Sequence, residues 1–170
     1  TGYKIIRENN FNDRSRHKIK ECSDEDNQNL IKALDYALCN KENLWSLIQS
    51  VKYVADKKIN GDFVECGVFQ GGSLGILSQY AGKYSLDCKI YGFDTFEEWI
   101  SDTSLSDKDI TLQGTKVKFK KTDNNFYPNM SEVENNLKKF SKNIIYFPKL
   151  IKGDVLKTLK DPKNIPEKIS

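Results

Sequence analysis

The sequence has few of the residues that most often serve as general bases or contact nucleic acids. Its only histidine is His17, which lies in a polar segment and is expected at the surface rather than in catalysis. Its only arginines are Arg7, Arg14 and Arg16, and the net charge is +3, so the lysine-rich surface does not favour a nucleic-acid partner. No stretch approaches the ~18 apolar residues of a membrane-spanning helix, so no membrane partner is expected.

Cysteine is also scarce, and its spacing is uninformative for metal. The four cysteines, Cys22, Cys39, Cys66 and Cys88, match neither a zinc site nor a secreted disulfide framework. A reduced, cytoplasmic protein is therefore expected. A length of 170 residues is consistent with one domain, and 30% charged residues indicate a polar surface.

Helix signals follow a polar N-terminal arm, which is predicted over residues 1–22 ahead of a domain over residues 23–170. Ser23 and Asn40 are predicted N-caps, and Ser131 with Glu134 has the spacing of a capping box. An Asn60-Gly61 pair is expected to end the second helix. The apolar stripes behind these signals are Leu30, Ile31, Leu34 and Leu38; Leu44, Leu47, Ile48, Val51 and Val54; and Met130, Val133, Leu137 and Phe140.

Short apolar runs alternate with helical segments from residue 63 onward. This strand–helix–strand order predicts an α/β fold with a parallel sheet and right-handed crossovers. The predicted strands span residues 63–66, 89–93 and 143–151, and the predicted helices span residues 73–81 and 155–159.

Residues 101–129 form a long polar stretch inside this pattern. Such a segment is typical of a lid or insertion loop, with simple disorder as the alternative. Asp102, Asp107 and Asp109 lie within it, but hard cations need several oxygens in fixed geometry. A solvated loop is therefore the preferred interpretation of these aspartates.

The stretch GDFVECGVFQGGS, residues 61–73, changes from a strand pattern to glycines. Glycine lets the backbone approach a ligand closely, and the helix that starts near Ser73 points free N–H groups at the same place. A dinucleotide fingerprint would need a glycine where Phe69 stands. Glu65 precedes the first glycine and suits a cationic ligand better than a pyrophosphate. S-adenosylmethionine fits, because it carries an ammonium, a sulfonium and a carboxylate but no phosphate.

Acidic residues end each of the three predicted strands: Glu65, Asp94 and Asp154. Ligands of open parallel sheets bind at the carboxyl ends of the strands. Asp94 could accept hydrogen bonds from two ribose hydroxyls, and Asp154 could meet an adenine amino group. The alternatives are structural: Glu65 as a carboxylate that caps nearby N–H groups, and Asp94 and Asp154 each as the N-cap of a helix.

The segments GDFVECGVFQGGS, KIYGFDTFEEW and LIKGDVLKTL together resemble the macrocin O-methyltransferase (TylF-like) family, over about residues 37–159. The resemblance implies a Rossmann-like class I methyltransferase that uses S-adenosylmethionine, typically with Mg²⁺, to methylate a hydroxyl of a sugar or other small metabolite. It places Asp94 on the ribose and Asp154 near the adenine. The residues it places around the methionine part of the cofactor are Glu65, Gly67, Gly71, Gly72 and Ser73.

The sequence departs from the family pattern at two places. The Thr-Met pair that often holds the cofactor carboxylate corresponds to Ala37 and Leu38, although Ser73 may compensate. The chain also stops at Ser170, before the family's aspartate-rich motif, so no catalytic base or metal ligand is assigned. We expect the N-terminal half of the domain, with one unpaired edge on the strand 63–66 and low stability on its own.

Two other functions stay open at this point. The chain could be a cofactor-binding module without catalytic activity, or, less favoured because of Phe69, a nicotinamide-dependent oxidoreductase. The expected partner is a small hydroxylated molecule, and a homo-oligomer is left open.

Overall fold

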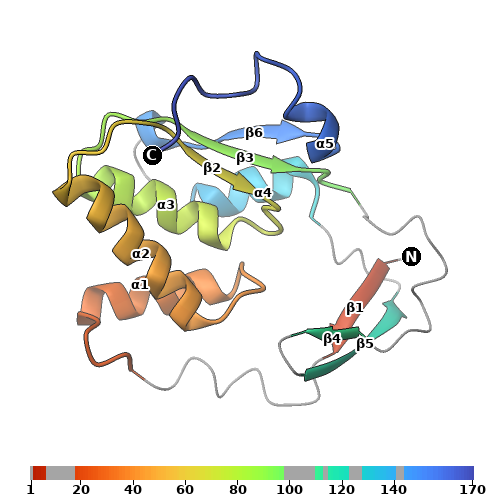
Figure 1. The fold of residues 1–170 in the computed structure, drawn as a ribbon. Coiled ribbons are helices and arrows are strands. Elements are labelled where there is room, and N and C mark those ends of the chain that lie inside the picture. Colours follow the sequence, from red (N-terminus) through yellow and green to blue (C-terminus); the bar gives the residue numbers. More distant parts are fainter. Residues whose placement is uncertain (1, 7–17, 98–109, 113–114, 123–127, 141–143) are drawn as a thin grey trace.

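The structure is a computed structural model that describes residues 2–6, 18–97, 110–112, 115–122, 128–140 and 144–170. Its central sheet has three parallel strands in the order β2-β3-β6, which confirms the predicted α/β class. In Figure 1, α3 and α4 lie along one face of this sheet, with α1 and α2 beyond them. The elements are β1 (Gly2–Ile6), α1 (Asp24–Leu34), α2 (Lys41–Asp56), β2 (Phe63–Cys66), α3 (Gly72–Lys83), β3 (Ile90–Asp94), β4 (Ile110–Leu112), β5 (Thr115–Thr122), α4 (Met130–Leu137), a 3₁₀ helix (Ile144–Tyr146), β6 (Lys149–Lys152) and α5 (Val155–Thr158).

The two predicted N-caps at the start of the domain are confirmed. The Ser23 hydroxyl accepts the N–H of Asp26 at the start of α1, and the Asn40 side chain accepts the N–H of Asn43 at the start of α2. Each cap satisfies one of the backbone donors that a helix start leaves free. The predicted buried face of α2 is also confirmed, with Leu47 at its partly buried margin.

Three helix details differ from the prediction. On α1 the buried residues are Leu30 and Ala33, whereas Ile31 is 40% exposed. The apolar stripe on α1 is wide, and the sequence did not indicate which of its edges faces α3. Helix α4 is capped by Asn129 with Glu132, two residues before the predicted capping box, because Asn129 is the residue that has extended backbone.

Helix α2 also ends earlier than predicted. It stops at Asp56, and Lys58 adopts a left-handed conformation with φ 52°. The N–H of Lys58 donates to Ala55 O and that of Ile59 to Val54 O, which is the hydrogen-bond pattern of a Schellman C-cap. Lys58 occupies the left-handed position that glycine usually takes after a helix. The Asn60-Gly61 pair therefore predicted a helix end beyond the one observed.

A second, antiparallel sheet has the order β1-β5-β4. It places Gly2–Ile6 in a strand, where a polar arm or loop was predicted, and two further strands inside the predicted lid. The prediction failed because Gly2 pairs with Thr122, a partner far away in sequence that local patterns do not reveal. Residues 1, 7–17, 101–109, 113–114 and 123–127, with His17, Asp102, Asp107 and Asp109, lie outside the described residues, and the division at residue 22 stays a prediction.

The outer edge of β2 is partly covered at its beginning. Asp62 forms a parallel bridge with Ile169; its N–H donates to Lys168 O at 2.8 Å, and its carbonyl accepts the N–H of Ser170 at 3.1 Å. Within the described residues, the strand Phe63–Cys66 itself pairs only with β3. The expected open edge is therefore present along β2 but not at Asp62. The expected low stability stays a prediction.

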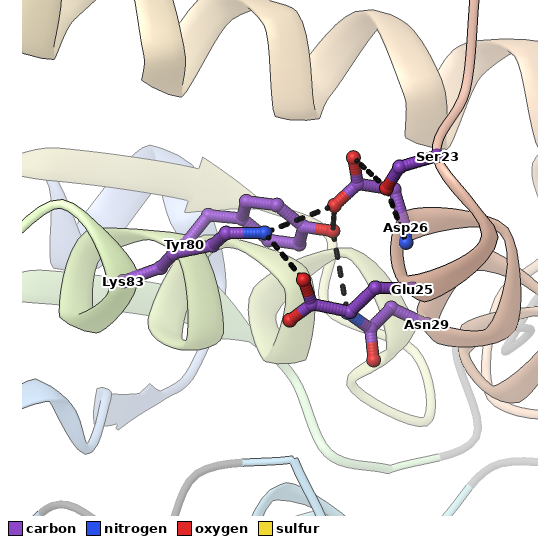
Figure 2. A network of polar contacts seen from close by, with 6 residues as sticks. All are labelled: Ser23, Glu25, Asp26, Asn29, Tyr80 and Lys83. Carbon is purple, nitrogen blue, oxygen red and sulfur yellow. Dashed lines mark hydrogen bonds and ion pairs between the residues drawn. The ribbon is translucent and has the colours of Figure 1, made fainter.

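A polar network fastens α1 to α3 (Figure 2). The hydroxyl of Tyr80, a fully buried residue on α3, donates to Asp26 of α1. Lys83 contacts the carboxylates of Glu25 at 3.0 Å and Asp26 at 3.3 Å, and Ser23 donates to Asp26 at 2.7 Å. The network holds α1 in place, and with it the turn between α1 and α2 that reaches the sheet's carboxyl edge.

Candidate functional site

A cavity of about 570 Å³ opens at the carboxyl ends of β2, β3 and β6. This is where parallel sheets bind their ligands. The cavity brings together three of the predicted site residues, Gly67, Asp94 and Asp154. The described residues that line it are Leu38, Gly67, Phe69, Phe93, Asp94, Thr95, Phe96, Glu97, Pro128, Gly153, Asp154 and Val155.

Asp94 ends β3 and reaches across to the loop that follows β2. Its Oδ2 accepts the N–H groups of Val68 at 2.7 Å and Phe69 at 3.0 Å. Its Oδ1 accepts the N–H of Phe96 at 3.1 Å and the Thr95 hydroxyl at 3.3 Å. Asp94 thus ties together the two loops that wall the cavity. Contact with a ribose stays a prediction, and a ribose would have to share these oxygens.

Two phenylalanines beside Asp94 have an unusual backbone. Phe69 and Phe96 have φ angles of 51° and 50°, in the left-handed region, and both line the cavity. A bulky L-residue there carries roughly 1–2 kcal/mol of strain. The N–H of each phenylalanine is bound by Asp94, which helps hold this conformation. Sequence reasoning noted Phe69 only as a missing glycine, and that missing glycine was the signal that could have revealed its backbone.

The carboxylate of Glu65 is buried behind this turn. Its Oε2 is buried and accepts no hydrogen bond from the described residues. Burial raises the pKa of Glu65 to about 7; a hydrogen bond with Ser73 opposes this shift, and the nearby Asp94 charge adds to it. A buried acceptor without a partner is rare in proteins, so this oxygen is a candidate ligand contact.

The paired glycines serve packing as well as the turn. Gly71 is the N-cap of α3 in a left-handed conformation, with φ 93°. A Cβ on Gly72 would lie 2.6 Å from Ala33 O and 2.7 Å from Ala37 Cβ, so α3 can approach the end of α1 only with glycine here. Neither glycine lines the cavity, and neither does Ser73. Their predicted contacts with a cofactor stay predictions.

Asp154 lines the cavity from the loop after β6. Its Oδ1 accepts the N–H of Leu156 at 2.9 Å and so caps α5, which confirms the structural alternative for this residue. The same side chain lines the cavity, so capping and ligand contact are compatible. The adenine contact stays a prediction.

Several lining residues were not predicted. Glu97 lies on the wall and forms an ion pair with Lys152 at 2.5 Å. Leu38, which stands where the resemblance expected a cofactor-holding Thr-Met pair, contributes an apolar wall instead. Glu97 comes from the loop after β3 and Leu38 from the turn between α1 and α2, and the course of such segments depends on tertiary contacts rather than on periodicity.

Metal and membrane features are absent from the described part of the chain. No group of three His, Cys, Asp or Glu side chains among these residues comes together as a metal site requires. None of the helices in the described ranges has the length and apolar character needed to span a bilayer. All four cysteines are free.

Comparison with known proteins supports the resemblance. A profile of the family described as macrocin O-methyltransferase (TylF) matches residues 2–161, which include the segment predicted as an arm. The solved structure of the O-methyltransferase NovP matches with a TM-score of 0.53 and 18% identity, over 73% of this chain and 50% of that chain. CalS11, a calicheamicin methyltransferase, matches with a TM-score of 0.48 and 18% identity, over 84% of this chain and 65% of that chain. No curated protein matches.

The likeness to NovP concerns the fold alone at this identity, and it confirms the predicted Rossmann-like architecture. The chain spans half the length of the NovP chain.

Proposed function

The chain belongs to the macrocin O-methyltransferase family, and from this premise we propose that it binds S-adenosylmethionine in the cavity at the carboxyl ends of β2, β3 and β6. The reaction proposed is transfer of the methyl group to a hydroxyl of a sugar or other small metabolite. The observation that carries the proposal is the meeting of Gly67, Asp94 and Asp154 on one cavity from three successive strands.

The lining suits the adenosine part of this cofactor. Phe93 and Phe96 supply apolar surface for a flat base, and the carboxylates of Asp94 and Asp154 can accept hydrogen bonds from hydroxyl and amino groups. Each carboxylate already accepts backbone N–H groups, which fixes its orientation. A ligand would therefore meet acceptors that are already in position.

Glu65 suits the cationic end of the cofactor. Its buried Oε2 lacks a partner among the described residues, and an ammonium group would supply one. Pairing with a cation would also favour the ionised carboxylate that burial now disfavours. The Ser73 hydroxyl, hydrogen-bonded to Glu65, would keep that carboxylate oriented.

The bound cofactor supplies an electrophilic methyl group for direct displacement by an acceptor oxygen. The chain's own contribution is positioning, and orienting two reactants can lower a barrier by roughly 7–11 kcal/mol. The described residues do not provide a ligand set for the Mg²⁺ that the resemblance implies, so no step is assigned to a metal. No described residue is assigned as the base for the acceptor hydroxyl.

Calorimetric titration with S-adenosylhomocysteine tests cofactor binding. We expect saturable binding that Glu65→Gln weakens, with Glu42→Gln, a change on the exposed side of α2, as the matched control. Tighter binding of NADH than of S-adenosylhomocysteine would contradict the proposal. Binding without methyl transfer to any hydroxylated acceptor would favour the alternative of a cofactor-binding module. The cytoplasmic location and the oligomeric state stay predictions.

A further inference from the structure

The glycine turn, residues 67–72, resembles an anion-binding loop, but its backbone N–H groups donate to acceptors of the protein itself. In phosphate-binding turns, successive backbone N–H groups point at the ligand. Here the N–H groups of Val68 and Phe69 point at Asp94 Oδ2, at 2.7 and 3.0 Å. A carboxylate of the protein thus stands where a ligand's phosphate would be held.

The glycine N–H groups of the turn are also occupied. Carbonyl oxygens of Phe93, Val68 and Tyr36 accept from Gly67, Gly71 and Gly72 at 2.8, 3.0 and 2.9 Å. A phosphate entering the cavity would therefore have to displace Asp94 to reach the N–H groups of Val68 and Phe69. It would also approach a second carboxylate that lines the cavity, that of Asp154.

The backbone conformation keeps the turn in this state. Phe69 holds its left-handed φ of 51° while its N–H stays on Asp94, and its side chain lines the cavity. Glycine at this position would allow the peptide to rotate freely, but phenylalanine restricts it. Phe96 is held in the same way from the other side of Asp94.

We propose that Asp94 is a specificity-determining residue that fills the anion position of the glycine turn and thereby excludes phosphorylated nucleotides from the cavity. The ligands it admits are nucleosides and nucleoside derivatives without phosphate. This inference rests on the proposed function, because it specifies the ligand class of the same cavity. It also gives a physical reason why a nicotinamide dinucleotide would be rejected.

The test is calorimetric titration of the wild type, Asp94→Ser and Asp154→Ser with adenosine and with ADP. The wild type should bind adenosine and bind ADP at least about tenfold more weakly, since one charge-assisted hydrogen bond gained or lost is worth that factor. Asp94→Ser frees the N–H groups of Val68 and Phe69, so its affinity for ADP should rise by about tenfold. Asp154→Ser removes an equal charge from the same cavity but should not produce this gain.

Three results would overturn the inference: equal wild-type affinity for adenosine and ADP, no gain of ADP affinity in Asp94→Ser, or the same gain in Asp154→Ser. If Asp94→Ser does not fold, Asp94→Ala, which also frees the N–H groups of Val68 and Phe69, replaces it in the comparison. Failure of the proposed function is separate, because it is read from S-adenosylhomocysteine. A chain that binds no S-adenosylhomocysteine, but whose Asp94→Ser variant gains ADP, would contradict the function and support the inference.

Discussion

Two carboxylates packed against α3, those of Asp26 and Glu65, differ in how many partners the protein gives them. Asp26, in the network of Figure 2, receives hydrogen bonds from Tyr80 and Ser23 and pairs with Lys83. Burial opposes its ionisation, but these partners hold the pKa of Asp26 below its usual range. Glu65 is buried with Oε2 unpartnered by the described residues, and burial raises its pKa to about 7.

The difference separates a contact that holds the fold from a carboxylate for which we propose a ligand as the partner. The α1–α3 network is complete within the chain, because Tyr80 and Lys83 are one turn apart on α3 and face Asp26 on α1. Glu65 instead carries a burial cost that its hydrogen bond with Ser73 offsets only in part. A buried polar group without a hydrogen-bond partner at the carboxyl edge of a sheet is evidence that the group has a role other than stabilising the fold.

The largest loss of stability is expected from replacing Tyr80, the residue at the centre of the network that joins α1 to α3. Tyr80→Ala deletes a fully buried ring and leaves Asp26 without its hydroxyl partner, so the free energy of unfolding should fall by about 3–5 kcal/mol. Urea unfolding measures this change. Tyr53→Ala, at a tyrosine that is 58% exposed, is the control and should change stability by less than about 0.5 kcal/mol. Equal effects in the two variants would mean that the network does not hold α1.

The next largest effect is a gain in stability, and we expect it from a substitution at Glu65. The raised pKa of Glu65 means that the carboxyl stabilises the fold fully below its unfolded value of 4.5, and that this stability is lost as pH rises toward about 7. Glu65→Gln removes the ionisation. Its stability relative to the wild type should therefore increase between pH 4.5 and 8, by up to roughly 3 kcal/mol.

Thermal unfolding across this pH range measures the effect, and titration with S-adenosylhomocysteine accompanies it. We expect a variant that is more stable at pH 8 but binds more weakly, which is the usual exchange between stability and function. A Glu65→Gln variant with the pH profile of the wild type would show that Glu65 does not titrate in this range.

Asp26 should give the reverse pH dependence. Its lowered pKa contributes stability that is present above the unfolded value of 3.8 and is lost as pH falls through the lower folded value. Asp26→Asn should therefore destabilise the protein at pH 7, by about 1 kcal/mol, and the difference from the wild type should shrink below pH 3.8. Urea unfolding at pH 7 and pH 3 checks this, and a constant difference would contradict it.

Features that depend on nearby residues could be predicted from the sequence, whereas features that depend on distant residues could not. Helix caps at Ser23 and Asn40, the strand Phe63–Cys66 and the acidic strand ends depend on local spacing, and they were predicted correctly. The pairing of Gly2 with Thr122 depends on a distant partner, and it was missed.

The site was predicted less completely than the fold, for a related reason. Residue type and strand order indicated that Gly67, Asp94 and Asp154 would converge, but not what each side chain does before a ligand arrives. That Asp94 would accept N–H groups from two loops depends on the left-handed backbone of Phe69 and Phe96, a conformation that phenylalanine rarely adopts.

The smallest effect is expected at Phe69, and a matched change at Phe96 sharpens it. Both residues have the same left-handed strain, which glycine relieves by roughly 1 kcal/mol. Phe96 is only 3% exposed, so Phe96→Gly also loses a buried ring and should destabilise the protein by about 2–3 kcal/mol net. Phe69 is partly exposed, so in Phe69→Gly the relief and the loss should cancel to within about 1 kcal/mol. Urea unfolding of both variants measures the difference. Equal destabilisation would mean that Phe69 packs into the fold as firmly as Phe96 does, and that its left-handed backbone serves stability rather than the shape of the cavity.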